Sequence, residues 1–181
     1  MNREQKTVGQ LGRSAMGGNI RRTFSAFGMA AAVMACVATA TPASAVSAGP
    51  FEAKLSGSVQ MTSPFSAVYS SDGLATHLGR THLEGSMNVT GPADCAGGFT
   101  ATHSETMTAA NGDQLFVEVL STDCPNPEVP GRYDCTGTYA ITGGTGRFST
   151  ASGQGGWAGT VTFDASGSGA FSESYWGLIS L

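Results

Sequence analysis

The amino-acid sequence predicts an all-β protein, a closed antiparallel eight-stranded barrel preceded by an N-terminal signal peptide. Apolar and polar residues alternate with a period of two along most of residues 46–181, as in strands that bury one face. Turn-forming residues separate these segments, and apolar residues do not recur there at helical spacing. Many strands with short connections form a sandwich or a barrel, and sequential hairpins favour closure because a barrel has no exposed strand edge.

The alternation predicts seven or eight strands. They lie at about 51–61, 65–70, 74–89, 98–109, 113–122, 132–142, 147–163 and 169–180, with 147–163 forming one strand or two. Ser71-Asp72-Gly73 is expected to be a turn. Asn111-Gly112 predicts a hairpin with a type I′ turn, in which both central residues have positive φ. Residues 143–146 predict a further turn, held by Arg147.

Residues 1–45 have the composition of an export signal. They contain five Lys and Arg residues against one acidic residue, then an apolar run from Phe24 to about Ala40, then Ala43-Ser44-Ala45. This order predicts a cleaved signal peptide, and therefore a secreted protein with no integral membrane segment after processing. Arg21-Arg22 also resembles a twin-arginine signal, and lipid anchoring at Cys36 is a minor alternative.

Residues 46–181 have the length of one domain. They carry four Lys and Arg residues against twelve Asp and Glu residues, with no basic stripe, so nucleic acid is not an expected partner. His77, His82 and His103 lack the close spacing of zinc ligands, so we expect no metal site and no cofactor. No Gly-x-Ser-x-Gly sequence supports a hydrolase.

The alternation places three ionisable residues on the expected inner face. His103 and Glu105 share the parity of Phe99, and Glu173 shares the parity of Tyr175. Burial in an apolar lumen raises the pKa of a carboxyl group and lowers that of histidine, which suits general acid–base catalysis. His103, Glu105 and Glu173 are therefore candidate catalytic residues. Alternatively, these side chains lie solvated at the barrel mouths, or a bulge inverts the parity.

Aromatic residues of the same parity are candidate ligand-binding residues, because flat side chains pack well on a small apolar molecule. They are Tyr69, Phe99, Tyr139, Trp157 and Tyr175. A small apolar molecule is therefore the expected partner.

Three cysteines lie in the expected barrel, and export favours a disulfide between two of them. The hairpin at Asn111-Gly112 brings Cys95 near Cys124, whereas the loop over residues 125–134 brings Cys124 opposite Cys135. We expect a Cys95–Cys124 disulfide with Cys135 free and buried. A Cys124–Cys135 disulfide is the alternative.

Residues 139–148, Tyr-Ala-Ile-Thr-Gly-Gly-Thr-Gly-Arg-Phe, resemble the signature of the allene oxide cyclase and dirigent barrel superfamily. Asn111-Gly112-Asp113 and the final Gly-Leu-Ile-Ser also look like the bacterial allene-oxide-cyclase-like barrels, so the resemblance covers residues 50–181. It implies an eight-stranded barrel with a largely apolar lumen, and a family of cofactor-free cyclases and coupling proteins that are often homo-oligomers. The motif is a structural turn, and the family's catalytic residues have no matched positions here.

Three functions remain open from the sequence. The protein is a secreted barrel that binds a small apolar molecule, a cofactor-free isomerase or cyclase, or a non-catalytic envelope or extracellular interaction protein. The resemblance does not decide between them, because a fold does not fix a function.

Overall fold

The computed structural model describes residues 47–181. The predicted leader, with Arg21-Arg22, Cys36 and Ala43-Ser44-Ala45, lies outside the described residues. Within the described part of the chain, no helix combines the length and the hydropathy needed to cross a membrane.

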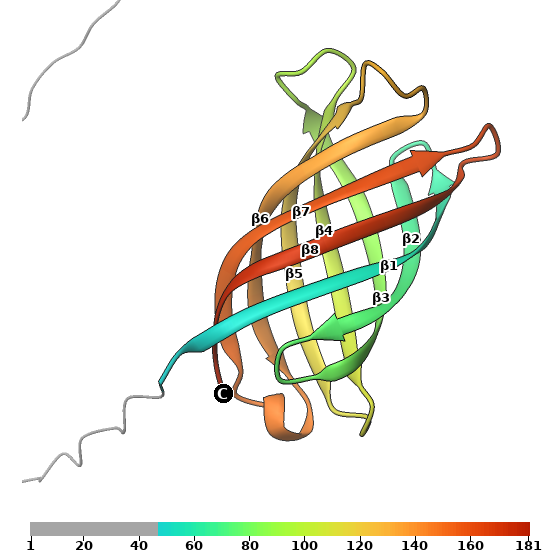
Figure 1. Ribbon diagram of the computed structural model, residues 1–181. Helices are drawn as coiled ribbons and strands as arrows, with labels where there is room; N and C mark the ends of the chain where they lie inside the picture. The colour runs from blue at the N-terminus through green and yellow to red at the C-terminus, as the bar shows by residue number, and fades with distance from the viewer. Residues whose placement is uncertain (1–46) are drawn as a thin grey trace, which may run out of the picture. The chain divides into compact units, whose positions relative to one another are not determined.

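Eight antiparallel strands form a closed barrel, as predicted (Figure 1). The elements are β1 (Gly49–Ser63), β2 (Ser66–Ala75), β3 (Gly79–Pro92), β4 (Phe99–Ala109), β5 (Gln114–Pro125), β6 (Arg132–Gly144), the 3₁₀ helix η1 (Gly146–Phe148), β7 (Ser152–Phe163) and β8 (Ser168–Ser180). Each strand pairs with the next in sequence, and β8 closes the barrel on β1, with Gly49 opposite Ile179 and Gln60 opposite Ser168. Closure therefore satisfies the backbone groups of both outer strands.

The up-and-down order gathers the connections at two ends of the barrel (Figure 1). One end, here called the open end, carries the β1–β2, β3–β4, β5–β6 and β7–β8 connections. The other, here called the closed end, carries the β2–β3 and β4–β5 connections, η1, the start of β1 and the end of β8.

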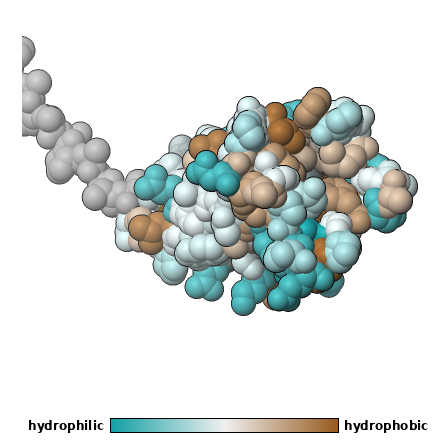
Figure 2. Space-filling view, turned by 90° about the horizontal axis from the view of Figure 1, so that it is seen from above, coloured by the Kyte–Doolittle hydropathy of each residue, from teal (hydrophilic) through white to brown (hydrophobic). Residues whose placement is uncertain are grey.

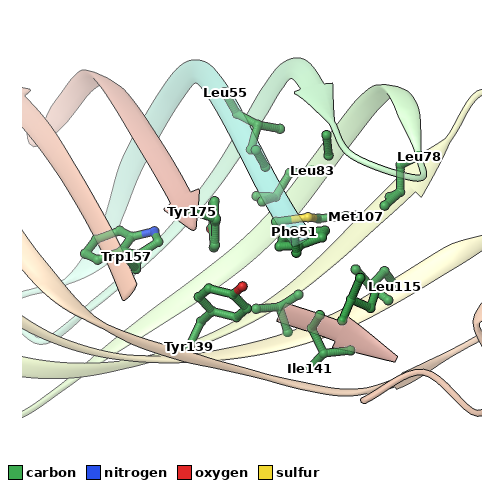
Figure 3. Packing of buried hydrophobic residues seen from close by; sticks show 14 of the residues in the cluster. Phe51, Leu55, Leu78, Leu83, Met107, Leu115, Tyr139, Ile141, Trp157 and Tyr175 are labelled. Carbon is green, nitrogen blue, oxygen red and sulfur yellow. The ribbon is translucent and has the colours of Figure 1, made fainter. Parts of the chain in front are cut away.

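Packed side chains fill the closed end. The fully buried ones include Phe51, Leu83, Met107, Leu115 and Phe148. Figure 3 shows Leu78 and Leu115 at one end of this cluster, Trp157 at the other, and Tyr139 and Tyr175 between them. Each fully buried large apolar side chain stabilises the fold by about 1.5–3 kcal/mol, so this end anchors the barrel.

The inward parity predicted from the alternation is confirmed along the strands. In β5, Leu115, Val117 and Val119 are completely buried, whereas the intervening Glu118 and Leu120 are exposed. The same alternation runs through β1 and β4. Odd-numbered side chains therefore point into a shared interior.

The predicted turn at Ser71-Asp72-Gly73 is wrong. These residues lie inside β2, and the chain turns instead at 76–78, where His77 has a φ of 66°. Gly73 keeps its place in the strand because the paired strand β1 lies so close that a Cβ there would overlap the carbonyl oxygen of Lys54. A glycine that looks like a turn signal thus serves a close approach of two backbones.

Two other turn predictions need correction. The hairpin at Asn111-Gly112 is confirmed, but its turn is not type I′, since only Gly112 has positive φ, 88°; the Gly112 amide donates to the carbonyl oxygen of Ala109 at 2.9 Å. The segment 147–163 forms a single strand only from Ser152 onward, because its start belongs to η1, which buries Phe148.

Arg147 holds the turn around η1, as predicted. Its guanidinium donates to the carbonyl oxygen of His77 at 2.8 Å, lies 3.6 Å from the carboxylate of Asp113 and covers the Phe148 ring at 4.8 Å from the ring centre. These contacts join η1 to the β2–β3 and β4–β5 connections of the closed end.

A disulfide joins Cys95 to Cys124, as expected, and Cys135 is a buried free thiol. The alternative Cys124–Cys135 pairing is therefore excluded. The bridge ties the β3–β4 connection to the end of β5 at the open end. Disulfides persist in oxidising surroundings, so this one suggests an extracellular type of environment.

Candidate functional site

A cavity of about 590 Å³ occupies the open half of the barrel. Figure 2 views this end from above and shows hydrophobic residues exposed among hydrophilic ones. Sites for small molecules have volumes of about 300–1,000 Å³, so the cavity has the size of a binding site.

The upper walls of the cavity are apolar. They include Met61, Met87, Phe99, Val161, Phe163 and Phe171. The aromatic rings contact one another: the Phe99 and Tyr133 rings lie 5.5 Å apart and the Tyr69 and Phe171 rings 5.3 Å apart. Such rings present a preformed surface to a flat or elongated apolar molecule.

Polar groups gather below these walls, where the cavity meets the packed core. The hydroxyl oxygen of Tyr175 lies 2.6 Å from Oε2 of Glu105 and 2.9 Å from Oε2 of Glu173. One hydroxyl has one proton to donate, so it donates to one carboxyl group and accepts from the other. The geometry therefore calls for a protonated carboxyl group in this pair.

Further donors fix Glu173 in place. The Trp157 indole N–H donates to Oε2 at 3.1 Å, and the Ser71 hydroxyl donates to Oε1 at 3.3 Å. Ser71 is buried on β2, which explains why the strand continues through the expected turn. Glu173 and Trp157 line the cavity, whereas Glu105 lies behind Tyr69 and does not.

A second series of hydrogen bonds extends from Glu105 to the opposite wall. The Tyr69 hydroxyl lies 2.7 Å from Oε1 of Glu105 and 3.0 Å from Nδ1 of His103. Nε2 of His103 lies 3.0 Å from the hydroxyl oxygen of Ser121, which in turn lies 3.3 Å from Oδ2 of Asp123. Polar side chains thus link Glu173 to Asp123 across the lumen.

Burial controls the protonation of this network. It raises the pKa of Glu105 to about 8 and that of Glu173 to about 7, and the negative charge of Glu173 adds to the shift of Glu105. Burial lowers the pKa of His103 to about 4, so the imidazole is neutral at pH 7. Burial also raises the pKa of Tyr69 and Tyr175 far above the ordinary value, so both hydroxyls keep their protons.

Asp123 and Cys135 lie side by side on paired strands beneath the aromatic wall. Burial raises the pKa of the Asp123 carboxyl group, although the Cys135 thiol and the Ser121 hydroxyl oppose this shift. Burial raises the pKa of the Cys135 thiol well above its usual range, which makes it a poor nucleophile. Oδ1 of Asp123 has no hydrogen-bond partner within residues 47–181.

The structure brings the three candidate catalytic residues, His103, Glu105 and Glu173, into one hydrogen-bonded network. Of the five candidate ligand-binding residues, Tyr69, Phe99 and Trp157 line the cavity. Tyr139 and Tyr175 are instead buried in the core below it. The Tyr139 hydroxyl has no partner among the described residues.

Three residues of the network, Ser71, Ser121 and Asp123, and one lining residue, Tyr133, are not among the candidates that the sequence indicates. The parity of β5 carries the signal for two of them, because Ser121 and Asp123 continue the buried series that begins at Leu115. Ser71 carried no such signal, since its Asp-Gly neighbours are typical of a turn.

Within residues 47–181, no three His, Cys, Asp or Glu side chains are grouped so as to hold a metal ion. What the arrangement offers is a set of neutral proton donors and acceptors at the bottom of an apolar cavity. Comparison with models of protein families, with curated proteins and with solved structures finds no match for this chain.

Proposed function

We propose that this protein is a secreted barrel that binds a small apolar molecule in its lumen. One observation carries the proposal: the open half of the barrel holds an unfilled cavity of about 590 Å³ with aromatic and aliphatic walls. A closed barrel of eight strands is able to fill its interior with side chains, as the closed end does here. Side chains that leave such a volume unfilled forfeit packing energy, and a ligand restores those contacts.

Two features support the secreted location. The Cys95–Cys124 disulfide is stable in an oxidising compartment, and the predicted signal peptide would direct the chain there. Kinship with the allene-oxide-cyclase-like barrels is also part of this proposal. It is supported by the motif over residues 139–148 together with the up-and-down strand order.

A matched pair of tryptophan substitutions tests the binding. Val161→Trp places a large ring in the cavity, whereas Thr136→Trp places the same ring on the exposed outer face of β6. We expect the neutral dye Nile red to gain fluorescence with the wild-type protein and with Thr136→Trp. We expect Val161→Trp to lose at least tenfold in affinity, because its ring occupies the dye's space.

Circular dichroism and urea unfolding would establish that both variants are folded. Failure of the wild-type barrel to bind Nile red or any member of a panel of neutral lipids would refute the proposal. Equal binding by Val161→Trp and Thr136→Trp would place the dye outside the lumen.

A second candidate function, a cofactor-free isomerase or cyclase, is favoured by one specific observation. Glu173 and His103 both line the cavity and are joined to Glu105 through tyrosine hydroxyls. A protonated carboxyl group beside a neutral imidazole provides an acid and a base in one water-poor site.

Proton exchange would distinguish this function from binding alone. A carbonyl compound taken up by the lumen, such as β-ionone, would be incubated with the protein in D₂O and examined by mass spectrometry. Catalysis predicts deuterium uptake that Glu173→Gln abolishes while the ligand still binds. Uptake at the rate of the free compound would leave the protein as a binder.

A further inference from the structure

Within the described chain, the lumen contains three carboxyl groups and no Lys or Arg side chain. Glu105, Asp123 and Glu173 are all almost fully buried. The cavity lining within the described chain includes no Lys or Arg, and no ion pair of residues 47–181 involves a lumen carboxyl group. A buried carboxylate without a partner is costly, so a positive charge placed among these groups would be stabilised.

Asp123 offers the position for such a charge. Asp123 is only 3% exposed and lines the cavity. Its Oδ1 is buried and has no hydrogen-bond partner among residues 47–181. The other oxygen, Oδ2, accepts from Ser121 at 3.3 Å. The Cys135 thiol lies beside the carboxyl group but is directed to the carbonyl oxygen of Tyr133 at 3.9 Å, so Oδ1 has no hydrogen-bond donor among the described residues.

The strand register places the Asp123 carboxyl group in a row of inward-facing residues. Across the barrel wall, Phe99, Asp123, Cys135, Gly159 and Glu173 stand opposite one another on β4 to β8 in a single row. Gly159 has no side chain, and the Trp157 ring lies over this position, 3.4 Å from where a Cβ would be; both residues line the cavity. Phe99, which pairs with Asp123 in this row, packs its ring against that of Tyr133. Aromatic faces also attract cations.

We infer that the lumen selects a lipophilic amine, bound as an ammonium ion with its N–H groups on Oδ1 of Asp123 and its apolar body against the aromatic walls. This inference rests on the proposed binding function and specifies the ligand class. A fatty acid of the same length is rejected, because its carboxylate would be the fourth acidic group in a lumen without a cation. A neutral alcohol binds with intermediate affinity through its hydroxyl group.

Three probes with one apolar body test this order: decylamine, decanol and decanoate. The protein has two tryptophans, of which Trp157 lines the cavity and Trp176 is exposed on the outer face. Trp176→Phe therefore leaves Trp157 as a single reporter of the lumen, and its fluorescence would be titrated with each probe at pH 7. We expect decylamine to bind roughly tenfold or more tighter than decanol, as for a hydrogen bond between charged groups, and decanoate to bind weakest.

Two substitutions assign the effect to Asp123. In the Trp176→Phe background, Asp123→Asn removes the ionisable group with little change in shape, and Glu118→Gln removes a carboxyl group from the outer face of the same strand. We expect Asp123→Asn to abolish the advantage of decylamine over decanol without weakening decanol. We expect Glu118→Gln to retain that advantage.

The outcomes separate the inference from the function on which it rests. Binding of all three probes with equal affinity, or a preference for decanoate, overturns the amine inference and leaves the lumen as an apolar binding site. If neither the three probes nor a neutral dye binds, both the amine inference and the proposed binding function are overturned.

If Asp123→Asn does not fold, nuclear magnetic resonance of the Trp176→Phe protein provides the test. The ¹³Cγ resonance of Asp123 must shift toward the ionised position with decylamine and not with decanol.

Discussion

Glu105 and Glu173 share the hydroxyl of Tyr175, and that sharing requires at least one of them to hold a proton in neutral solution. A protonated carboxyl group donates a hydrogen bond that a carboxylate cannot donate. The pair therefore behaves as one acid with two linked dissociation steps. Its state determines what the bottom of the cavity presents to a ligand.

This pair makes stability depend on pH. In the folded protein the pKa is about 7 for Glu173 and about 8 for Glu105, both above the ordinary value of 4.5, so the fold binds more protons than the unfolded chain. Their stabilising effect is complete below pH 4.5 and is lost as the pH rises through the folded pKa values. His103, whose pKa is lowered to about 4, acts in the opposite direction, but only below about pH 6.5.

Between pH 6.5 and 8.5 the glutamates therefore dominate. We expect the free energy of unfolding to fall by on the order of 2 kcal/mol over this range, measured by urea unfolding. Glu105→Gln should show a much smaller decrease, because the amide does not titrate. Glu84→Gln on the outer face of β3 is the control and should follow the wild type, and equal slopes for all three proteins would contradict the assignment.

Sequence alternation placed His103, Glu105 and Glu173 on the inner face, but it could not show which of them touch. Glu105 lies on β4 and meets Tyr175 of β8 across the lumen, a contact that depends on closure and register. Similarly, Tyr139 and Tyr175 have the parity of cavity residues but lie too deep along the barrel. The alternation predicts which side chains point inward. It does not predict how far along the barrel axis each of them lies, because that position depends on the tilt of the strands.

Among the strands, β1 and β2 show how local signals are overridden by neighbours. Ser71-Asp72-Gly73 has the composition of a turn, yet it pairs with residues of β1 on one side and β3 on the other. In the curved barrel wall the paired strand β1 lies so close to β2 that a side chain at position 73 would overlap it. Periodicity predicts the eight strands and their order, but it does not show that Ser71-Asp72-Gly73 belongs to a strand, because glycine suits both a turn and a close approach of two backbones.

Alanine substitutions test this close approach of β1 and β2. A Cβ at Gly73 would overlap the carbonyl oxygen of Lys54, so Gly73→Ala should destabilise the barrel by about 1–3 kcal/mol. Gly91 of β3 is the matched control, since a Cβ there would lie 3.6 Å from Thr100 Oγ1, an ordinary contact. Gly91→Ala should change stability by no more than about 0.5 kcal/mol in urea unfolding, and a similar effect at both sites would argue against a steric cause.

The whole barrel joins a packed half to a hollow half. The closed half holds the continuous core that includes Phe51, Met107 and Phe148. In the open half, side chains do not fill the interior and leave the cavity. The disulfide lies in the hollow half, where Cys95 in the β3–β4 connection is tied to Cys124 of β5. The cross-link thus stabilises the half of the barrel that holds the cavity.

Removal of this cross-link should therefore be costly. The two cysteines are 29 residues apart, and a loop of that length predicts a loss of about 3–4 kcal/mol in the Cys95→Ser/Cys124→Ser variant. Urea unfolding of the variant and of the wild type with and without dithiothreitol measures it. Reduced wild type should match the variant, and the variant should be insensitive to reductant; a wild type unaffected by reduction would show that the bridge contributes nothing.

The packed core at the closed end affects how a bound ligand exchanges. Phe51, Leu115 and Phe148 are packed across the closed end of the barrel. A bound molecule must therefore leave through the open end, where it also entered. An incoming molecule cannot push it out from behind, so exchange proceeds by departure first and replacement second. Release measured with excess competitor should then be a first-order process whose half-time does not change with the amount of competitor added.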